Sequence, residues 1–117
     1  MGERRLSIMK KQFRVWIHCR ISMGVSKSIL EYQKSRLIEY AIQNNMKIVG
    51  ITKLISNGKH LEQFEVHSML TAIRRQEIDI ILVYSSTRIS IYPDVYDEFV
   101  LFCEMHNVKV HCISKHS

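Results

Sequence analysis

Two loops of this sequence combine an arginine with hydroxyl side chains, and each loop follows a short apolar run. Arg20 and Ser22 come after the run FRVWIHC at residues 13–19, and Arg88 lies within the segment SSTRIS at residues 85–90. A guanidinium binds phosphate oxygens through two parallel hydrogen bonds, and a hydroxyl held beside it can attack phosphorus. The pattern therefore indicates phosphoryl transfer, and the alternative is an ordinary polar connection between a strand and a helix.

The elements that would hold these loops alternate along the chain. Four runs rich in β-branched residues predict strands, and the segments between them repeat their apolar residues with the period of a helix. The predicted strands cover residues 13–19, 46–54, 78–84 and 108–114. This order predicts an α/β fold, a three-layer sandwich around a mostly parallel sheet of four or five strands. The loops after the first and third strands then meet at the same carboxyl edge of the sheet, where open α/β sheets usually have their sites.

Length and composition are those of one globular domain. The chain has 117 residues, 46% of them hydrophobic and 24% charged, so one core and one principal site are expected. We expect residues 1–12 to form a flexible N-terminal extension and residues 13–117 to form the domain. The formal net charge of +6 favours an anionic partner such as nucleic acid. No apolar stretch approaches the roughly 20 residues of a membrane span, and no signal peptide opens the chain, so we expect a cytoplasmic protein without membrane contact.

The sequence indicates no cofactor or metal site. It lacks both G-x-x-x-x-G-K-[ST] and G-x-G-x-x-G, the phosphate-binding patterns of P-loop and dinucleotide folds. Its three cysteines have no C-x-x-C spacing, and its six histidines fit no common metal pattern. We therefore expect reduced cysteines, no metal and no cofactor.

Four segments share their motifs and their order with one known family. They are RIS at residues 20–22, SILEYQKSRLIEYA at 28–41, DIILVYSSTRIS at 79–90 and NVKVHCIS at 107–114. The first resembles R-[VI]-S after a strand, the second S-[IL]-x-x-Q-x-x-x-L, and the third a strand that ends in D-R-x-x-R. The fourth resembles the segment before a long helix. Together they resemble the catalytic domain of the serine recombinases, the resolvase and invertase family, from about residue 13 to residue 114.

The resemblance implies a role for each residue of the pattern. Ser22 would attack a DNA phosphodiester and form a 5′-phosphoserine link, while Arg20 and Arg88 hold the phosphate and stabilise the charge of the transition state. Gln33, on the inner face of the first helix, would position the active-site loop. The implied partners are DNA and further copies of this chain, in a homodimer or a higher oligomer.

The chain departs from the family pattern at cationic positions. Thr87 and Ile91 replace the acid and the second arginine of D-R-x-x-R, and Gln63 or a neighbour stands where the family's S-G-x-x-x-x-R has its arginine. One preorganised charge is worth about 2.7 to 4 kcal/mol, so two missing arginines would remove about 5 to 8 kcal/mol, or roughly four to six orders of magnitude in rate. Lys59 and His60 could supply part of that charge as phosphate contacts, although lysine lacks the planar fork of arginine.

Two functions are therefore favoured, while a third, an unrelated small-molecule role, is allowed by the fold class but has no residue that supports it. One is a serine recombinase catalytic domain with an incomplete set of arginines. The other is a catalytically silent resolvase-like module that acts through protein contacts or weak nucleic-acid binding. Arg88 could also pair with Asp94 or Asp97 instead of a phosphate. Family members usually continue past the last strand into a long helix and a DNA-binding domain, so the sequence is either a trimmed catalytic domain or a standalone relative.

Overall fold

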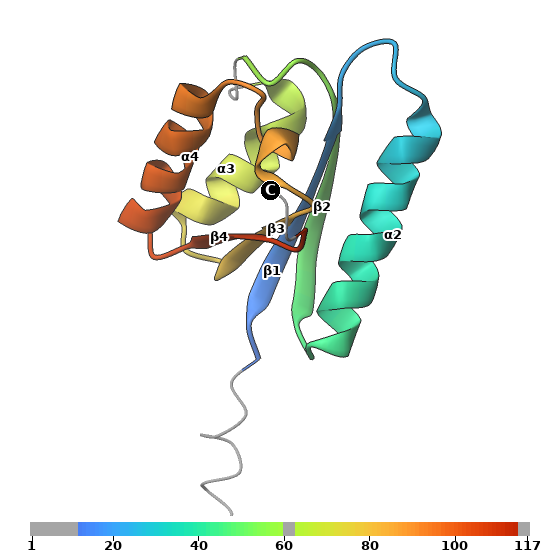
Figure 1. Ribbon diagram of the computed structural model, residues 1–117. Coiled ribbons are helices and arrows are strands. Elements are labelled where there is room, and N and C mark those ends of the chain that lie inside the picture. The colour runs from blue at the N-terminus through green and yellow to red at the C-terminus, as the bar shows by residue number, and fades with distance from the viewer. Residues whose placement is uncertain (1–11, 60–62, 115–117) are drawn as a thin grey trace, which may run out of the picture.

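Strands and helices alternate from one end of the fold to the other. The computed structural model of this chain describes residues 12–59 and 63–114 (Figure 1). Within them the strands are β1 (Arg14–Ile21), β2 (Lys47–Ile55), β3 (Ile80–Val83) and β4 (Lys109–Cys112). The helices are α2 (Lys27–Gln43), α3 (His67–Arg74) and α4 (Pro93–Met105), with short 3-10 helices η1 (Phe64–Val66) and η2 (Ser86–Arg88). All but the last residue of the predicted N-terminal extension lies outside the described residues.

The four described strands form one parallel sheet in the order β2-β1-β3-β4. The central strand β1 pairs with β2 along its whole length, as far as Ile21 opposite Ile55. It pairs with β3 only over Val15, Trp16 and Ile17. Because the strands are parallel, the loops after β1, β2 and β3 leave the sheet at the same edge. The predicted α/β fold is confirmed.

Helices cover both faces of this sheet, so the fold has three layers (Figure 1). Helix α2 lies on one face, and α3 and α4 lie on the other. The β1 residues packed in the core against α2 are Val15, Ile17, Cys19 and Ile21. Since side chains alternate along a strand, the residues between them face α3 and α4, and Trp16 packs against that second core. His18 and Arg20 therefore lie on the same face as Trp16.

The ends of the helices follow from particular residues. The hydroxyl of Ser26 accepts a hydrogen bond from the Ser28 backbone N–H at 3.3 Å and caps α2, and Pro93 begins α4, where its missing N–H has no helical partner to lose. Asn45 and Asn107 have φ angles of 55° and 62°, a conformation that asparagine tolerates, and they turn the chain out of α2 and α4 into the next strand.

Strand β1 is longer than the sequence pattern predicted. Its ladder with β2 continues to Ile21, so Arg20 belongs to the strand, and Ser22 is the first residue beyond it. The predicted third strand is shorter in the structure, where β3 covers only Ile80–Val83.

Three further observations bear on what the described residues can do. No helix in these segments is both long and apolar enough to cross a bilayer. No cluster of three His, Cys, Asp or Glu side chains within the same segments could hold a metal ion. The cysteines at positions 19, 103 and 112 are free thiols.

Candidate active site

The carboxyl end of β1 brings Arg20 and Ser22 together. Arg20 is only 1% exposed, and its Nη1 lies 3.5 Å from the Oγ of Ser22. Ser22 opens a tight turn, in which the Val25 N–H donates to the Ser22 carbonyl at 3.2 Å. Gly24 has a φ of 87° in that turn, which suits a residue without a side chain. The turn thus holds the Ser22 hydroxyl next to a buried guanidinium.

The same guanidinium reaches two other loops. Nη1 of Arg20 donates to the backbone carbonyl of Ser56, the first residue after β2. Nη2 donates to the backbone carbonyl of Thr87 in η2. One side chain therefore links the loops that follow β1, β2 and β3.

Gln33 holds the backbone of Arg20 from the α2 side. The Gln33 Oε1 accepts from the Arg20 N–H at 3.2 Å, and its Nε2 donates to the Arg20 carbonyl at 3.0 Å. Since β3 pairs only with residues 15–17, these backbone groups have no partner in the ladder on that side. The buried amide replaces the missing strand and fixes the end of β1.

Arg88 lies near enough to Arg20 for their charges to interact. Burial, followed by the positive charge of Arg88, lowers the pKa of Arg20 from its ordinary value. The buried Nε atoms of both arginines have no hydrogen-bond partner in the described part of the chain. Unpaired buried donors and an excess of positive charge are features of a site that suits an anion.

His18 lies two residues before Arg20 on the same face of β1. Its side chain is fully buried, and neither ring nitrogen has a hydrogen-bond partner among the residues described. Burial, and secondly the charge of Arg20, lower the pKa of His18 to about 4. The imidazole is therefore neutral at pH 7 and adds no charge to the site.

Comparison with known proteins identifies the family. The profile of the family described as Resolvase, N terminal domain, matches residues 15–117. This chain belongs to the resolvase family. None of the curated proteins matches the sequence.

Solved structures of serine recombinase catalytic domains share the fold of this resolvase-family chain. The C-terminal catalytic domain of ISC1926 TnpA, an IS607-like serine recombinase, is 21% identical with a TM-score of 0.79, over 86% of this chain and 70% of that chain. The N-terminal catalytic domain of TP901-1 integrase is 22% identical with a TM-score of 0.75, over 86% and 76%. A resolvase family site-specific recombinase from Streptococcus pneumoniae is 23% identical with a TM-score of 0.70, over 87% and 72%.

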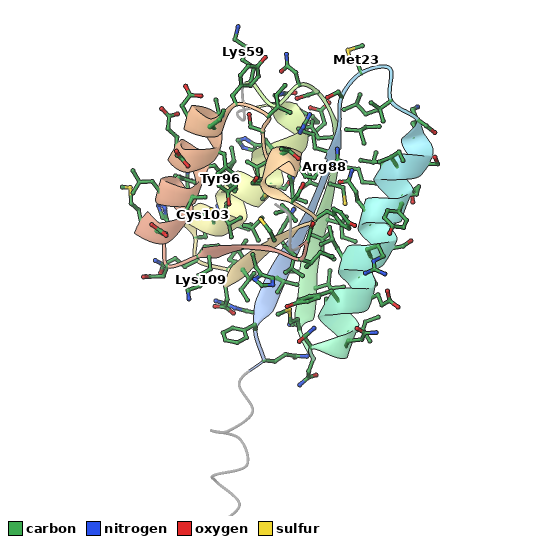
Figure 2. All side chains as sticks on the ribbon, in the orientation of Figure 1. Met23, Lys59, Arg88, Tyr96, Cys103 and Lys109 are labelled. Carbon is green, nitrogen blue, oxygen red and sulfur yellow. The ribbon has the colours of Figure 1, made fainter. Side chains whose placement is uncertain are left out.

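The resolvase fold brings some of the predicted site residues together and leaves Lys59 on the surface. Arg20 contacts Ser22 and lies close to Arg88, which makes no ion pair with an aspartate in the described segments. Lys59 is exposed and projects from the same end of the molecule as Met23, with Arg88 deeper between them (Figure 2). His60, the other predicted phosphate contact, lies outside the described residues.

The positions that depart from the resolvase-family motifs lie in the same loops. Gln63 Nε2 donates to the Ser56 Oγ at 3.1 Å, which ties it to the loop after β2. The Thr87 hydroxyl lies 2.9 Å from the Ser85 Oγ, and Ile91 is 49% exposed. None of these side chains carries a charge.

Sequence reasoning missed the roles of two backbone carbonyls at the site, and one buried side chain near it. Ser56 and Thr87 act on Arg20 through backbone carbonyls, and the type of a residue gives no signal for such a role. His18 could have been found, because the alternation of β1 puts it on the same face as Arg20 in a run that is otherwise apolar.

Proposed function

We propose that this chain is a DNA-acting serine recombinase catalytic domain in which Ser22 attacks a phosphodiester. One observation carries the proposal. The Ser22 Oγ lies 3.5 Å from Arg20 Nη1 at the end of the central strand, and the buried Nε atoms of Arg20 and Arg88 have no hydrogen-bond partner among the described residues. A nucleophile beside unpaired cationic donors is the arrangement that phosphoryl transfer needs.

The proposed reaction is a transesterification. The Ser22 oxygen forms a bond to phosphorus while the bond from phosphorus to the 3′ oxygen breaks. The serine proton passes to the departing 3′ oxygen, and the 5′ phosphate stays on Ser22. One phosphate ester replaces another, so the step needs no nucleotide hydrolysis, and a 3′ hydroxyl of another strand can reverse it.

Positive charge supports the binding of DNA. Arg20 and Arg88 would hold the reacting phosphate, and Lys59 and His60 would contact phosphates next to it. The formal net charge of +6 favours the same polyanion. Because strand exchange joins ends from two duplexes, we expect more than one copy of the chain on the DNA, in a homodimer or a higher oligomer.

A second function is favoured by the positions that depart from the family motifs. The side-chain amide of Gln63 donates a hydrogen bond to Ser56, and Ile91 has an apolar side chain where the motif has an arginine. With this charge missing, the domain would act as a silent module that pairs with an intact recombinase or binds nucleic acid weakly.

A covalent trap tests the first function. The protein and its Ser22→Ala variant are incubated with intact and nicked DNA fragments, denatured, and assayed for DNA that remains attached. Attachment that depends on Ser22 supports phosphoserine chemistry. Absence of attachment, with folded protein and with longer forms of the chain included, would contradict it.

Restoring the missing charge separates the two functions. The double variant Gln63→Arg, Ile91→Arg should raise the yield of adduct by several orders of magnitude, since each preorganised cation is worth about 2.7 to 4 kcal/mol. Ile42→Arg with Gln43→Arg adds the same charge at exposed positions of α2 and serves as the matched control. Equal yields from the two double variants would mean that the substituted positions do not explain low activity.

A further inference from the structure

A hydrogen bond that does not involve Arg20 joins the loop after β2 to the loop after η2. The Ser90 Oγ donates to the Gly58 carbonyl at 2.7 Å and accepts from the Tyr92 N–H at 3.0 Å. Ser90 is 3% exposed, so water does not compete for these hydrogen bonds. The hydrogen bond that the Ser90 hydroxyl donates to Gly58 links the two loops, and the one that it accepts from Tyr92 lies within its own loop.

Gly58 allows this close approach. Its φ is 78°, and a Cβ at this position would lie 2.8 Å from the Ser90 Cα and 3.1 Å from the Ile89 carbonyl oxygen. A side chain would therefore strain the backbone and push the two loops apart.

The two carbonyls that hold the Arg20 guanidinium lie next to this link, one in the loop after β2 and the other in η2, directly before the second loop. The carbonyl of Ser56 lies two residues before Gly58, and the carbonyl of Thr87 lies three residues before Ser90. Arg20 donates to both carbonyls from a rigid planar fork, so their separation must match the spacing of its two Nη atoms. Any movement of one loop relative to the other changes that separation.

We propose that Ser90 is a positioning residue of the Ser22 site. Its hydroxyl joins the loop after β2 to the loop after η2, and so holds the two carbonyls that fix the Arg20 guanidinium beside Ser22. This inference rests on the proposed function for its catalytic consequence. The structural link from Ser90 to Arg20 does not depend on it.

Four variants test the link. Ser90→Ala removes the hydroxyl, and Gly58→Ala separates the same two loops from the other side. Ser90→Thr keeps a hydroxyl at the position. Thr52→Ala is the matched control, because the Thr52 hydroxyl is equally buried but accepts its hydrogen bond from Trp16 Nε1, at 2.6 Å.

The first readout is the nitrogen-15 NMR spectrum of the arginine side chains, which needs no DNA. Two carbonyl acceptors slow the rotation of the Arg20 guanidinium, so its Nη groups should give separate signals in the wild-type protein, in Ser90→Thr and in Thr52→Ala. In Ser90→Ala and Gly58→Ala these signals should merge. Separate Arg20 signals in Ser90→Ala would overturn the inference.

The second readout is the rate at which Ser22 forms its DNA adduct. We expect Ser90→Ala to lower this rate by about ten- to a hundredfold, since a displacement near 1 Å can have an effect of that size. Thr52→Ala should keep the wild-type rate, and a loss as large as that of Ser90→Ala would overturn the catalytic part of the inference. If no protein forms an adduct while the Arg20 signals change as expected, the recombinase reaction fails and the structural link stands.

Discussion

The two faces of β1 carry opposite chemistry within a few residues of each other. Ile17, Cys19 and Ile21 face α2 and are fully buried among apolar side chains. His18 and Arg20 face α3 and α4 and are equally buried, yet three of their nitrogen atoms have no hydrogen-bond partner among the described residues. Burial of the three apolar side chains stabilises the domain, whereas burial of His18 and Arg20 costs free energy.

This difference indicates where the fold serves something other than stability. Buried polar groups in proteins nearly always find partners, so unpaired ones need a reason. Arg20 is held by backbone carbonyls, while its Nε and the Nε of Arg88 have no hydrogen-bond partner among the described residues. The polar face of β1 thus combines a guanidinium held by two carbonyls with buried nitrogen atoms that have no partner among the described residues.

Loss of the Arg20 guanidinium should have the largest effect on stability. Arg20→Met keeps a long side chain but leaves the carbonyls of Ser56 and Thr87 without donors, and two such buried acceptors together cost about 4 kcal/mol. Arg88→Met is the matched control. Within the described part of the chain its Nε has no partner to lose, so the free energy of unfolding in urea should change by less than about 1 kcal/mol. Equal losses in the two variants would mean that the carbonyl contacts do not hold the loops.

Acid should destabilise the polar face through His18. Its pKa of about 4 in the folded protein lies below the ordinary value of 6.5, so the unfolded chain binds the proton first as the pH falls. The stabilising contribution is complete above pH 6.5 and is lost between 6.5 and 4, by about 3 kcal/mol.

Urea unfolding of the wild type and of His18→Gln at about pH 7.5 and about pH 4.5 checks this. The glutamine variant does not titrate at this position, so its stability should fall by less over the same range. Parallel losses in both proteins would show that other groups cause the acid sensitivity.

Gln33 of α2 binds the backbone of Arg20 from the apolar side of β1. Its removal should lower the free energy of unfolding by less than the loss of the Arg20 guanidinium. Gln33→Leu leaves the Arg20 N–H and carbonyl without their partner, which we expect to lower the free energy of unfolding by about 2 kcal/mol. Gln43→Leu, at an exposed position of the same helix, should be close to neutral. Hydrogen exchange of the Arg20 amide should become faster in Gln33→Leu alone, and unchanged exchange would contradict the role given to this hydrogen bond.

The apolar face of β1 could be predicted from the sequence, whereas most of the polar face could not. The runs of β-branched residues identify the strands, and the periodicity between them identifies the helices, because burial imposes both patterns. The sequence pattern predicts an end of β1 that is two residues too early, since a charged residue such as Arg20 is unusual within a strand. It is tolerated there because Gln33 and the carbonyls of two loops satisfy it.

The resemblance to serine recombinases identified Ser22, Arg20, Gln33 and Arg88 as candidates, because side chains of fixed type recur at fixed positions in a family. The hydrogen bonds between loops did not follow from it. Ser90 and Gly58 meet only through the folded backbone, and neither residue type in isolation predicts a partner 32 residues away.

The smallest expected effect concerns the reactivity of Cys19, the thiol on the face of β1 that packs against α2. Burial raises the pKa of Cys19 to about 12, and burial likewise raises that of Cys103 to about 12. Both should resist alkylation near pH 8 while the protein is folded, because only the thiolate reacts and neither thiol is accessible. Mass spectrometry should then show modification of Cys112 alone.

If Gln33→Leu exposes Cys19 to the reagent but Arg88→Met does not, the amide of Gln33 is what keeps the apolar face closed at the end of β1. Rapid modification of Cys19 in the wild type would show instead that this face opens without any change to the site.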